Sequence, residues 1–492
     1  MSVKLSAQTL GALAPSIAVP RYERAGLTPG IFHFGVGNFH RAHQAVYLDD
    51  LLNLGFGRDW AIMGGGVRAA DALVREKLQA QDWLTTIVAQ EADASQVRVT
   101  GSMIGFVEPS DVAATLDMLA DPQIRIVSLT ITEGGYYISP ATQKFDAAHP
   151  DILADAADIA KPRTVFGFIV AGLMRRRNAG VAPFTVMSCD NIPGNGHVTE
   201  NAVVGLASLV DKEMAQWIAR QVAFPNSMVD RITPATTDRE RAMLLESHGV
   251  VDSWPVFCEE FRQWVVEDKF PAGRPAFEKV GVTFSADVEL YETMKIRILN
   301  GGHAAIAYPA ALLDIHFVHE AMQDAQICAY LEKLTREEII PVVAPPPQVN
   351  LRQYAEKIAS RFANPKIGDT IARLCFDGSN RQPKFILPTV VDRLKAGASI
   401  KGLALVSALW CRYCYGESLS GKTIAANDPS WDRLQAAARS ARTAPTAFLA
   451  MEDIFGALAR DPAYIQAFSA NLAALWGRGV RPVLADYLAD RL

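Results

Sequence analysis

The chain has 492 residues, of which 50% are hydrophobic and 21% are charged, a composition typical of a globular protein with large cores. Single hydrophobic cores stop growing at roughly 250 to 300 residues, so this length predicts two domains. With a net charge of −5 and a pI near 6.0, the chain has no basic excess to neutralise a nucleic-acid backbone or an anionic membrane, and the expected partner is a small molecule.

The sequence also predicts a cytoplasmic protein. Residues 1–20 hold no apolar stretch followed by a cleavage site, and every later apolar run stops short of the ~20 residues that cross a bilayer. The six cysteines are too scattered for a disulfide framework. Cys411 and Cys414 lie close together in helix-like sequence with no second pair nearby, which favours two core thiols over a metal or redox site.

The first predicted element is a strand, a tight turn and a helix over residues 30–43. A short apolar stretch ends in paired glycines there, and a helix-like segment follows. Gly35 and Gly37 match the first two positions of a dinucleotide-binding fingerprint, in which glycine lets a pyrophosphate approach the backbone at a helix N-terminus. A simple strand-to-helix turn is the alternative, because His40 occupies the place of the third glycine. The candidate cofactor-binding residues of this segment are Gly35, Gly37, Asn38, Phe39 and His40.

Further strands are predicted over residues 60–67, 124–131 and 184–189, with helices over 69–80 and 164–179 and a loop over 190–196. Strands that alternate with helices predict a parallel sheet, and the loops after its strands face the ligand. The acid that contacts the cofactor ribose is expected after the second strand. Asp71 in this region favours NAD, whereas Arg68 leaves NADP open.

From about residue 290 the sequence changes to amphipathic segments of helical period, over 291–306, 324–336, 351–362, from 393 onward and over 454–458. The expected fold is therefore α/β, with a Rossmann-type dinucleotide-binding domain over 1–285 and a mostly α-helical domain over 286–492. The histidines show no pattern typical of a metal site, and no metal is expected.

The segment 291–303 concentrates polar groups among apolar neighbours. At 3.6 residues per turn, Glu292, Lys295 and His303 fall within roughly 80° of one another, and Asn300 extends the arc to about 140°. One side of a helix can present all four side chains. A solvated face with an ordinary ion pair between Glu292 and Lys295 is the alternative.

Several motifs together resemble one family. They are GVGNFHRAHQ at 35–44, LTITEGGY at 129–136, FTVMSCDN at 184–191, FRQWVVED at 261–268, MKIRILNGGH at 294–303 and FVHE at 317–320. The chain resembles the polyol-specific long-chain dehydrogenase family, which includes mannitol 2-dehydrogenases and fructuronate reductases. This resemblance implies an active site between the two domains, no catalytic zinc and a monomer.

The resemblance also implies site residues. It makes Lys295 the general acid or base, Asn191 and Asn300 the donors to the substrate oxygen, and His303 an orienting partner. Acidic residues around the lysine are expected at Glu133, Asp230 and Glu292, and substrate-binding cations at Arg373 and Lys384. Arg381 stands where lysine is more usual in the family.

The expected activity is NAD-dependent interconversion of a sugar alcohol and its 2-ketose, of the mannitol and fructose type. Lysine can accept the alcohol proton only when neutral, and its pKa is ordinarily about 10.4, so oxidation is expected to need alkaline pH. A fructuronate reductase is the alternative within the family, with Arg373, Arg381 or Lys384 holding the substrate carboxylate. A non-catalytic dinucleotide sensor is the alternative of a different class.

Overall fold

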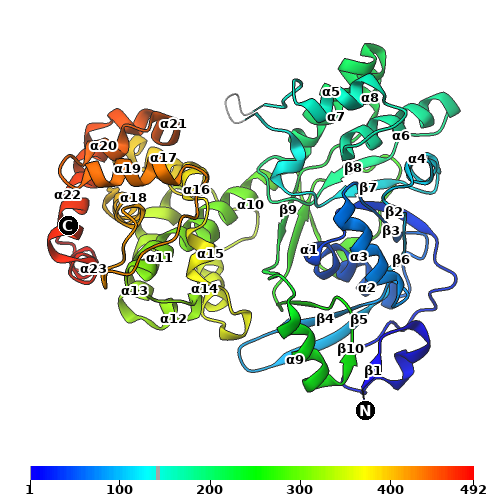
Figure 1. Cartoon of the computed structure of the whole chain (residues 1–492), viewed down its shortest axis with the longest axis horizontal. Coiled ribbons are helices and arrows are strands. Elements are labelled where there is room, and N and C mark those ends of the chain that lie inside the picture. The colour runs from blue at the N-terminus through cyan, green and yellow to red at the C-terminus, as the bar shows by residue number, and fades with distance from the viewer. Residues whose placement is uncertain (1, 140–143) are drawn as a thin grey trace. The chain divides into compact units, whose positions relative to one another are not determined.

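The computed structural model describes residues 2–139 and 144–492, and the chain forms two compact units, 1–289 and 290–492 (Figure 1). The sequence analysis expected the division after residue 285.

The first unit is built on a five-stranded parallel sheet with the strand order β6-β3-β2-β7-β8. If these five strands are numbered 1 to 5 in chain order, their order in the sheet is 3-2-1-4-5, as in a doubly wound dinucleotide-binding fold. The prediction of a Rossmann-type sheet is confirmed, including the strands expected near 30, 60, 124 and 184. The strands are β2 (Pro29–Phe34), β3 (Ala61–Gly65), β6 (Met103–Phe106), β7 (Ile126–Leu129) and β8 (Thr185–Ser188).

Alternate side chains of these strands enter two separate cores. Phe32, Val127 and Val186 pack in one apolar cluster, whereas Ile31 and Ile126 pack in another. A sheet buried on both faces reads as nearly continuous apolar sequence, which is why its strands were recognisable. The helices of this unit are α1 (Asn38–Ala42), α2 (Gln44–Asn53), α3 (Ala69–Gln79), α4 (Val112–Ala120), α5 (Pro150–Ala157), α6 (Val165–Ala179), α7 (Asn195–Val210), α8 (Lys212–Gln221) and α9 (Asp238–His248), with 3-10 turns η1 (Ala7–Ala12), η2 (Glu133–Tyr136) and η3 (Phe277–Val280).

The first unit also contains smaller sheets that the sequence analysis did not predict. One has the order β11-β4-β5, another β13-β12-β9, and β1 pairs with β10. They join segments far apart in the chain, as when β11 pairs in parallel with β4. Their strands are β1 (Val3–Lys4), β4 (Thr85–Gln90), β5 (Ser95–Thr100), β9 (Ser227–Asp230), β10 (Val250–Val251), β11 (Val256–Glu259), β12 (Gln263–Val266) and β13 (Thr283–Phe284).

The second unit is mostly helical, as expected, with isolated β-bridges between Phe317 and Thr370 and between Glu417 and Thr423. Helix α18 lies at its centre, and nearly all of its side chains are buried. Cys411 and Cys414 are free and buried on this helix, which confirms their interpretation as core thiols. The elements are α10 (Val288–Met294), η4 (Lys295–Asn300), α11 (Gly301–Leu312), α12 (Val318–Gln323), α13 (Ala325–Leu334), η5 (Thr335–Ile339), η6 (Ile340–Val342), α14 (Leu351–Phe362), η7 (Pro365–Ile367), α15 (Ile371–Cys375), α16 (Gly378–Phe385), α17 (Leu387–Lys395), α18 (Lys401–Cys414), α19 (Trp431–Ala441), α20 (Thr446–Leu449), α21 (Glu452–Phe455), η8 (Gly456–Arg460), α22 (Pro462–Arg478) and α23 (Val480–Leu488).

Several boundaries differ from the predictions. The expected helix 291–306 is interrupted by η4, and the expected helix 324–336 ends in η5; both interruptions are π-helical. The expected loop 190–196 is shorter, because α7 already begins at Asn195. Within the described parts of the chain, no helix is long and apolar enough to span a bilayer.

Candidate functional site

The turn after β2 leads directly into α1 at the sheet edge where the strand order reverses. Gly35 has a φ of +90°, and a Cβ there would lie 2.1 Å from the carbonyl oxygen of Thr130, so packing against β7 requires glycine. At Gly37 a Cβ would meet its nearest protein atom only at 3.8 Å. The protein therefore leaves space beside Gly37, and this backbone fits an approaching pyrophosphate.

His40, at the place of the third fingerprint glycine, packs α1 against β2 with an aromatic ring. Its ring stacks on His33 at a centroid distance of 3.6 Å and an interplanar angle of 13°. His33 in turn bonds Ser128 Oγ at 2.7 Å and Thr130 Oγ1 at 2.9 Å. Both rings are buried, and neither nitrogen of His40 has a partner among the described residues. A stacked pair of neutral imidazoles replaces the close helix-to-strand contact that glycine would give.

This burial has a consequence for acid stability. Burial lowers the pKa of His33 to about 3 and the pKa of His40 well below its usual value, so the unfolded chain binds more protons than the folded one below about pH 6.5. The free energy of unfolding should therefore fall as pH decreases from 6.5 toward 3. We expect His40→Phe, which keeps the stacking, to make this fall shallower by about 1.4 kcal/mol per pH unit.

Urea unfolding at pH 7.5, 6.0 and 5.0 measures the effect. His197→Phe is the matched control, because the His197 side chain is 66% exposed. The same slope in His40→Phe and wild type would contradict a neutral buried His40.

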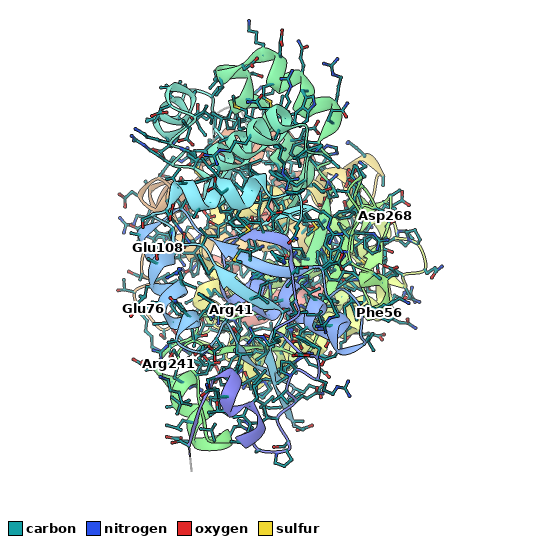
Figure 2. The ribbon with its side chains drawn as sticks, turned by 90° about the vertical axis from the view of Figure 1, so that its right-hand side faces the viewer. Arg41, Phe56, Glu76, Glu108, Arg241 and Asp268 are labelled. Atoms are coloured by element: carbon teal, nitrogen blue, oxygen red, sulfur yellow. The ribbon has the colours of Figure 1, made fainter. Side chains whose placement is uncertain are left out.

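The side chains of Asn38 and Phe39 have protein partners. Asn38 Nδ2 donates to Pro234 O at 3.1 Å and to Thr236 Oγ1 at 2.9 Å, and its Oδ1 accepts from Arg41 Nη2 at 2.7 Å. Phe39 stacks on a neighbouring histidine in the same segment. Arg41 is buried; Figure 2 labels it near the middle of the view, and Glu76 nearer the left margin. Contacts of Asn38 and Phe39 to a cofactor remain predictions.

Arg68 and Asp71 lie at the junction of β3 and α3, where the ribose-binding acid was expected. The carboxylate of Asp71 accepts from the backbone N–H groups of Val67 at 3.0 Å and Arg68 at 2.9 Å, and so caps α3. The side chain of Arg68 is 70% exposed and contacts Asp71 Oδ1 at 3.3 Å. The carboxylate of Asp71 is therefore bonded to the protein backbone, whereas the guanidinium of Arg68 is accessible to solvent.

Glu133 and Asn191 follow the neighbouring strands β7 and β8 and therefore lie at the same sheet edge as the Gly35 turn. Glu133 begins η2 and is exposed, and Asn191 is exposed in the loop before α7. Asp230 ends β9 and is 5% exposed. Asn195 ties β9 to this loop, because its Nδ2 donates to Asp190 O at 3.0 Å and to Ser227 O at 2.7 Å. The first unit thus gathers its predicted site residues on the ligand side of the sheet.

In the second unit, Lys295 and Asn300 are the first and last residues of the π-helix η4. The two residues are 7% and 8% exposed, and the preceding Glu292 is 9% exposed. The expected arc of about 140° assumed a regular α-helix. In η4 the backbone bond runs between residues five apart, as from Gly301 N–H to Ile296 O. Residues five apart become neighbours, so Lys295 and Asn300 share one face more closely than predicted.

His303 lies one turn further along α11. Its ring stacks on Phe362 at a centroid distance of 4.0 Å, and its Nε2 is buried without a partner among the described residues. Burial, followed by the nearby guanidinium groups of Arg373 and Arg361, lowers the pKa of His303 well below its usual value. A neutral imidazole with an unused nitrogen suits a hydrogen bond to a polar ligand.

The expected substrate cations lie on α15 and α16. Arg373 is paired with Asp369, and Arg381 Nη1 donates to the carbonyl oxygens of Arg373 and Leu374, each at 3.2 Å. Lys384 is exposed on α16. Arg381 therefore braces the end of α15 that carries Arg373. The sequence analysis missed Arg361, a buried arginine on α14 whose charge reaches His303.

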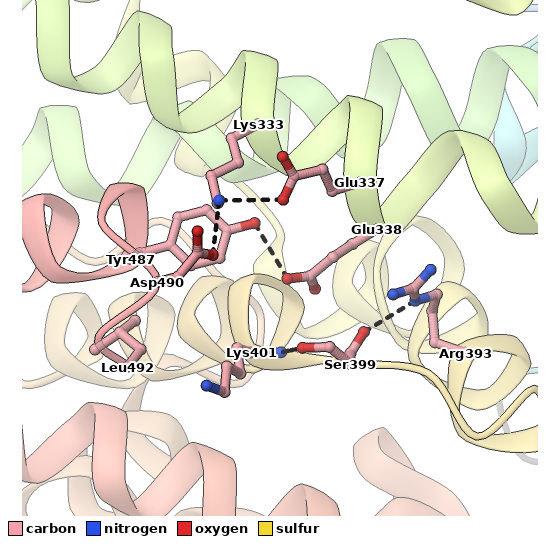
Figure 3. Close-up of a pocket in the computed structure, with 9 residues that line it drawn as sticks. All are labelled: Lys333, Glu337, Glu338, Arg393, Ser399, Lys401, Tyr487, Asp490 and Leu492. Atoms are coloured by element: carbon pink, nitrogen blue, oxygen red, sulfur yellow. Dashed lines mark hydrogen bonds and ion pairs between the residues drawn. The ribbon is translucent and has the colours of Figure 1, made fainter.

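A cavity of the second unit lies elsewhere. It has a volume of about 140 Å³, and Figure 3 shows the carboxylate of Glu338 within it. Glu338 accepts from the N–H groups of Gly402 at 2.7 Å and Leu403 at 2.9 Å and from Tyr487 Oη at 3.1 Å, so it caps α18. None of the predicted site residues lines this cavity, whose residues are Lys333, Glu337, Glu338, Arg393, Ser399, Lys401, Tyr487, Asp490 and Leu492.

The chain is similar to known proteins over almost its whole length. The mannitol dehydrogenase Rossmann domain matches residues 29–279, and the mannitol dehydrogenase C-terminal domain matches residues 287–476. A mannitol 2-dehydrogenase of Cereibacter sphaeroides is 58% identical over 96% of this chain and 99% of its own. Over residues 2–139 and 144–492, no cluster of three or more histidine, cysteine or acidic side chains is arranged to hold a metal ion.

Two solved structures are similar over nearly their full length. The Pseudomonas fluorescens mannitol 2-dehydrogenase ternary complex with NAD and D-mannitol has a TM-score of 0.89 and 44% identity, covering 99% of this chain and 100% of that one. A substrate-free D-sorbitol dehydrogenase has a TM-score of 0.90 and 34% identity, covering 98% of this chain and 100% of that one.

Proposed function

The chain belongs to the mannitol dehydrogenase family, and we propose that it interconverts a sugar alcohol and its 2-ketose, of the mannitol and fructose type, using NAD. The Gly35–Gly37 turn would hold the pyrophosphate of NAD, and the reduced cofactor supplies the hydride when bound. As parts of the same proposal, the enzyme is a cytoplasmic monomer, and light scattering after gel filtration tests its mass in solution.

The protein's own side chains then have to transfer one proton and stabilise the negative charge that develops on the substrate oxygen. In ketose reduction, protonated Lys295 donates to the carbonyl oxygen, while the side-chain amides of Asn191 and Asn300 donate hydrogen bonds to it. His303, kept neutral, orients the substrate hydroxyls. In alcohol oxidation, neutral Lys295 accepts the hydroxyl proton.

The observation that carries this proposal is the pairing of Lys295 and Asn300, both buried, across the π-helix η4. A proton donor and an amide donor on one face can serve a single oxygen. The alternative considered from the sequence was an exposed polar face with an ordinary ion pair between Glu292 and Lys295. That arrangement would leave Lys295 and Asn300 exposed to solvent.

Oxidation of NADH by the purified protein with fructose, other ketoses and fructuronate tests the function. Turnover with fructose or another ketose supports the proposal. A preference for fructuronate would contradict the polyol assignment, and NADH binding without turnover of any of these compounds would favour a sensor.

Arg68 gives a separate prediction about cofactor choice. NAD is the expected cofactor, but the exposed guanidinium after β3 can contact a 2′-phosphate, and the carboxylate of Asp71 is engaged in capping α3. We expect Arg68→Ala to lower kcat/KM with NADPH by about 10- to 100-fold, the value of one or two charge-assisted hydrogen bonds, and to change kcat/KM with NADH little.

Arg75→Ala is the control, since Arg75 lies on α3, which Arg68 directly precedes, and its Nε donates to Phe106 O at 2.9 Å. Equal losses with both cofactors in Arg68→Ala would show that Arg68 supports the fold of the turn and does not read the 2′-phosphate.

A further inference from the structure

Thr132, directly before Glu133, has a backbone conformation that side chains rarely adopt. Its φ is +63° and its ψ is 165°, a region occupied almost only by glycine, and threonine is β-branched. Such a conformation persists only where the surroundings enforce it, and it is concentrated at functional sites.

The carboxylate of Asp190 supplies that enforcement. Its Oδ1 accepts from the N–H of Thr132 at 2.9 Å, and its Oδ2 accepts from the N–H of Ile131 at 2.9 Å and from Tyr136 Oη at 2.7 Å. Three donors from one short segment therefore converge on one side chain. Only a carboxylate, which accepts at both oxygens, satisfies all three.

Asp190 is also fixed on its own side. Its N–H donates to Ser188 Oγ at 3.2 Å, the same hydroxyl that lies 2.6 Å from Tyr136 Oη. Tyr136 is fully buried. The next residue is Asn191. One carboxylate thus joins the loop after β7, which carries Glu133, to the loop after β8, which carries Asn191.

We propose that Asp190 is a positioning residue, which locks Thr132 in its strained conformation and thereby fixes Glu133 relative to Asn191. This inference rests on the proposed function, in which Asn191 donates to the substrate oxygen. Asp190 acts through Asn191 and Glu133 and does not itself touch the substrate.

A double-mutant cycle tests the link. Asp190→Asn removes one acceptor and turns an amide donor toward the other donors, so Thr132 is expected to leave its strained conformation. We expect kcat for ketose reduction to fall about 10-fold or more, the scale of a small displacement of a catalytic group, with little change in KM for NADH. In the Thr132→Gly background the loss caused by Asp190→Asn should be smaller, because glycine adopts positive φ without strain.

Asp211→Asn is the matched control. Asp211 also accepts from two backbone N–H groups, those of Glu213 at 2.8 Å and Met214 at 3.2 Å, but it caps α8 away from the two loops. Its replacement should leave kcat unchanged, because the amide oxygen of asparagine can accept both bonds. An unchanged kcat in Asp190→Asn, or equal losses in the wild-type and Thr132→Gly backgrounds, would overturn the inference.

Failure of the proposed function is distinguishable. A wild-type protein that turns over no ketose would refute the function. Hydrogen exchange of the Ile131 and Thr132 amides would then test by itself whether Asp190 holds Thr132 in its strained conformation. Faster exchange of these amides in Asp190→Asn than in wild type supports this role of Asp190, and equal exchange refutes it.

Discussion

Replacing Lys295 by methionine is expected to lower kcat for NADH-dependent ketose reduction by about 10²- to 10⁴-fold, the usual contribution of a positioned general acid or base. Lys295 is 7% exposed at the start of η4. Methionine preserves much of the apolar stem but removes the ammonium, so the local packing survives while the proton donor is lost. Steady-state kcat and KM for fructose, with Tm as a check on folding, measure the change.

Lys395→Met is the matched control, because Lys395 is exposed at the end of α17. Added methylamine should restore part of the activity of Lys295→Met by supplying the missing proton donor. A kcat within about threefold of wild type would exclude lysine as the general acid, since such a loss is far below the typical contribution.

The pH dependence provides a second test of the same residue. Reduction requires protonated lysine and oxidation requires neutral lysine, whose ordinary pKa is about 10.4. Mannitol oxidation should therefore rise with pH, and fructose reduction should be favoured near neutral pH. Both dependences should be lost in Lys295→Met. Flat profiles in the wild type would argue against lysine.

The parts of the fold that the sequence predicted are those with local signals. The turn at Gly35 and Gly37 was recognisable because the glycines, the apolar strand before them and the helix after them are adjacent. The short strands β11 and β12 were not predicted, because each is stabilised by pairing with a distant segment. Apolar periodicity cannot identify such partners.

The same distinction applies to the candidate site. The family resemblance supplied the residue types at Lys295, Asn191 and Asn300, but a helical wheel could not supply η4, since it assumes a constant 3.6 residues per turn. Asp71 fitted the expected ribose-binding acid by position, yet its carboxylate caps α3. Asp190 was passed over because its bond to Thr132 spans 58 positions in the chain.

Removal of the amide donor at Asn300 has the second large expected effect. Asn300→Asp keeps the size of the side chain but replaces its N–H donor with a carboxylate, which repels a developing oxyanion. We expect kcat to fall by about 10²- to 10³-fold, the loss typical for one oxyanion donor. KM should change much less, because the hydrogen bond strengthens as charge accumulates on the substrate oxygen in alcohol oxidation.

Asn471→Asp separates this effect from the general cost of altering a buried asparagine. Asn471 is 4% exposed on α22, and its Nδ2 donates to Lys401 O at 3.1 Å, outside the candidate site. Its replacement should lower Tm without lowering kcat. If Asn300→Asp instead raised KM at constant kcat, Asn300 would bind ground state and transition state equally. The pairing of Lys295 with Asn300 across η4 would then serve substrate binding alone, and the charge on the reacting oxygen would have to be stabilised by Asn191.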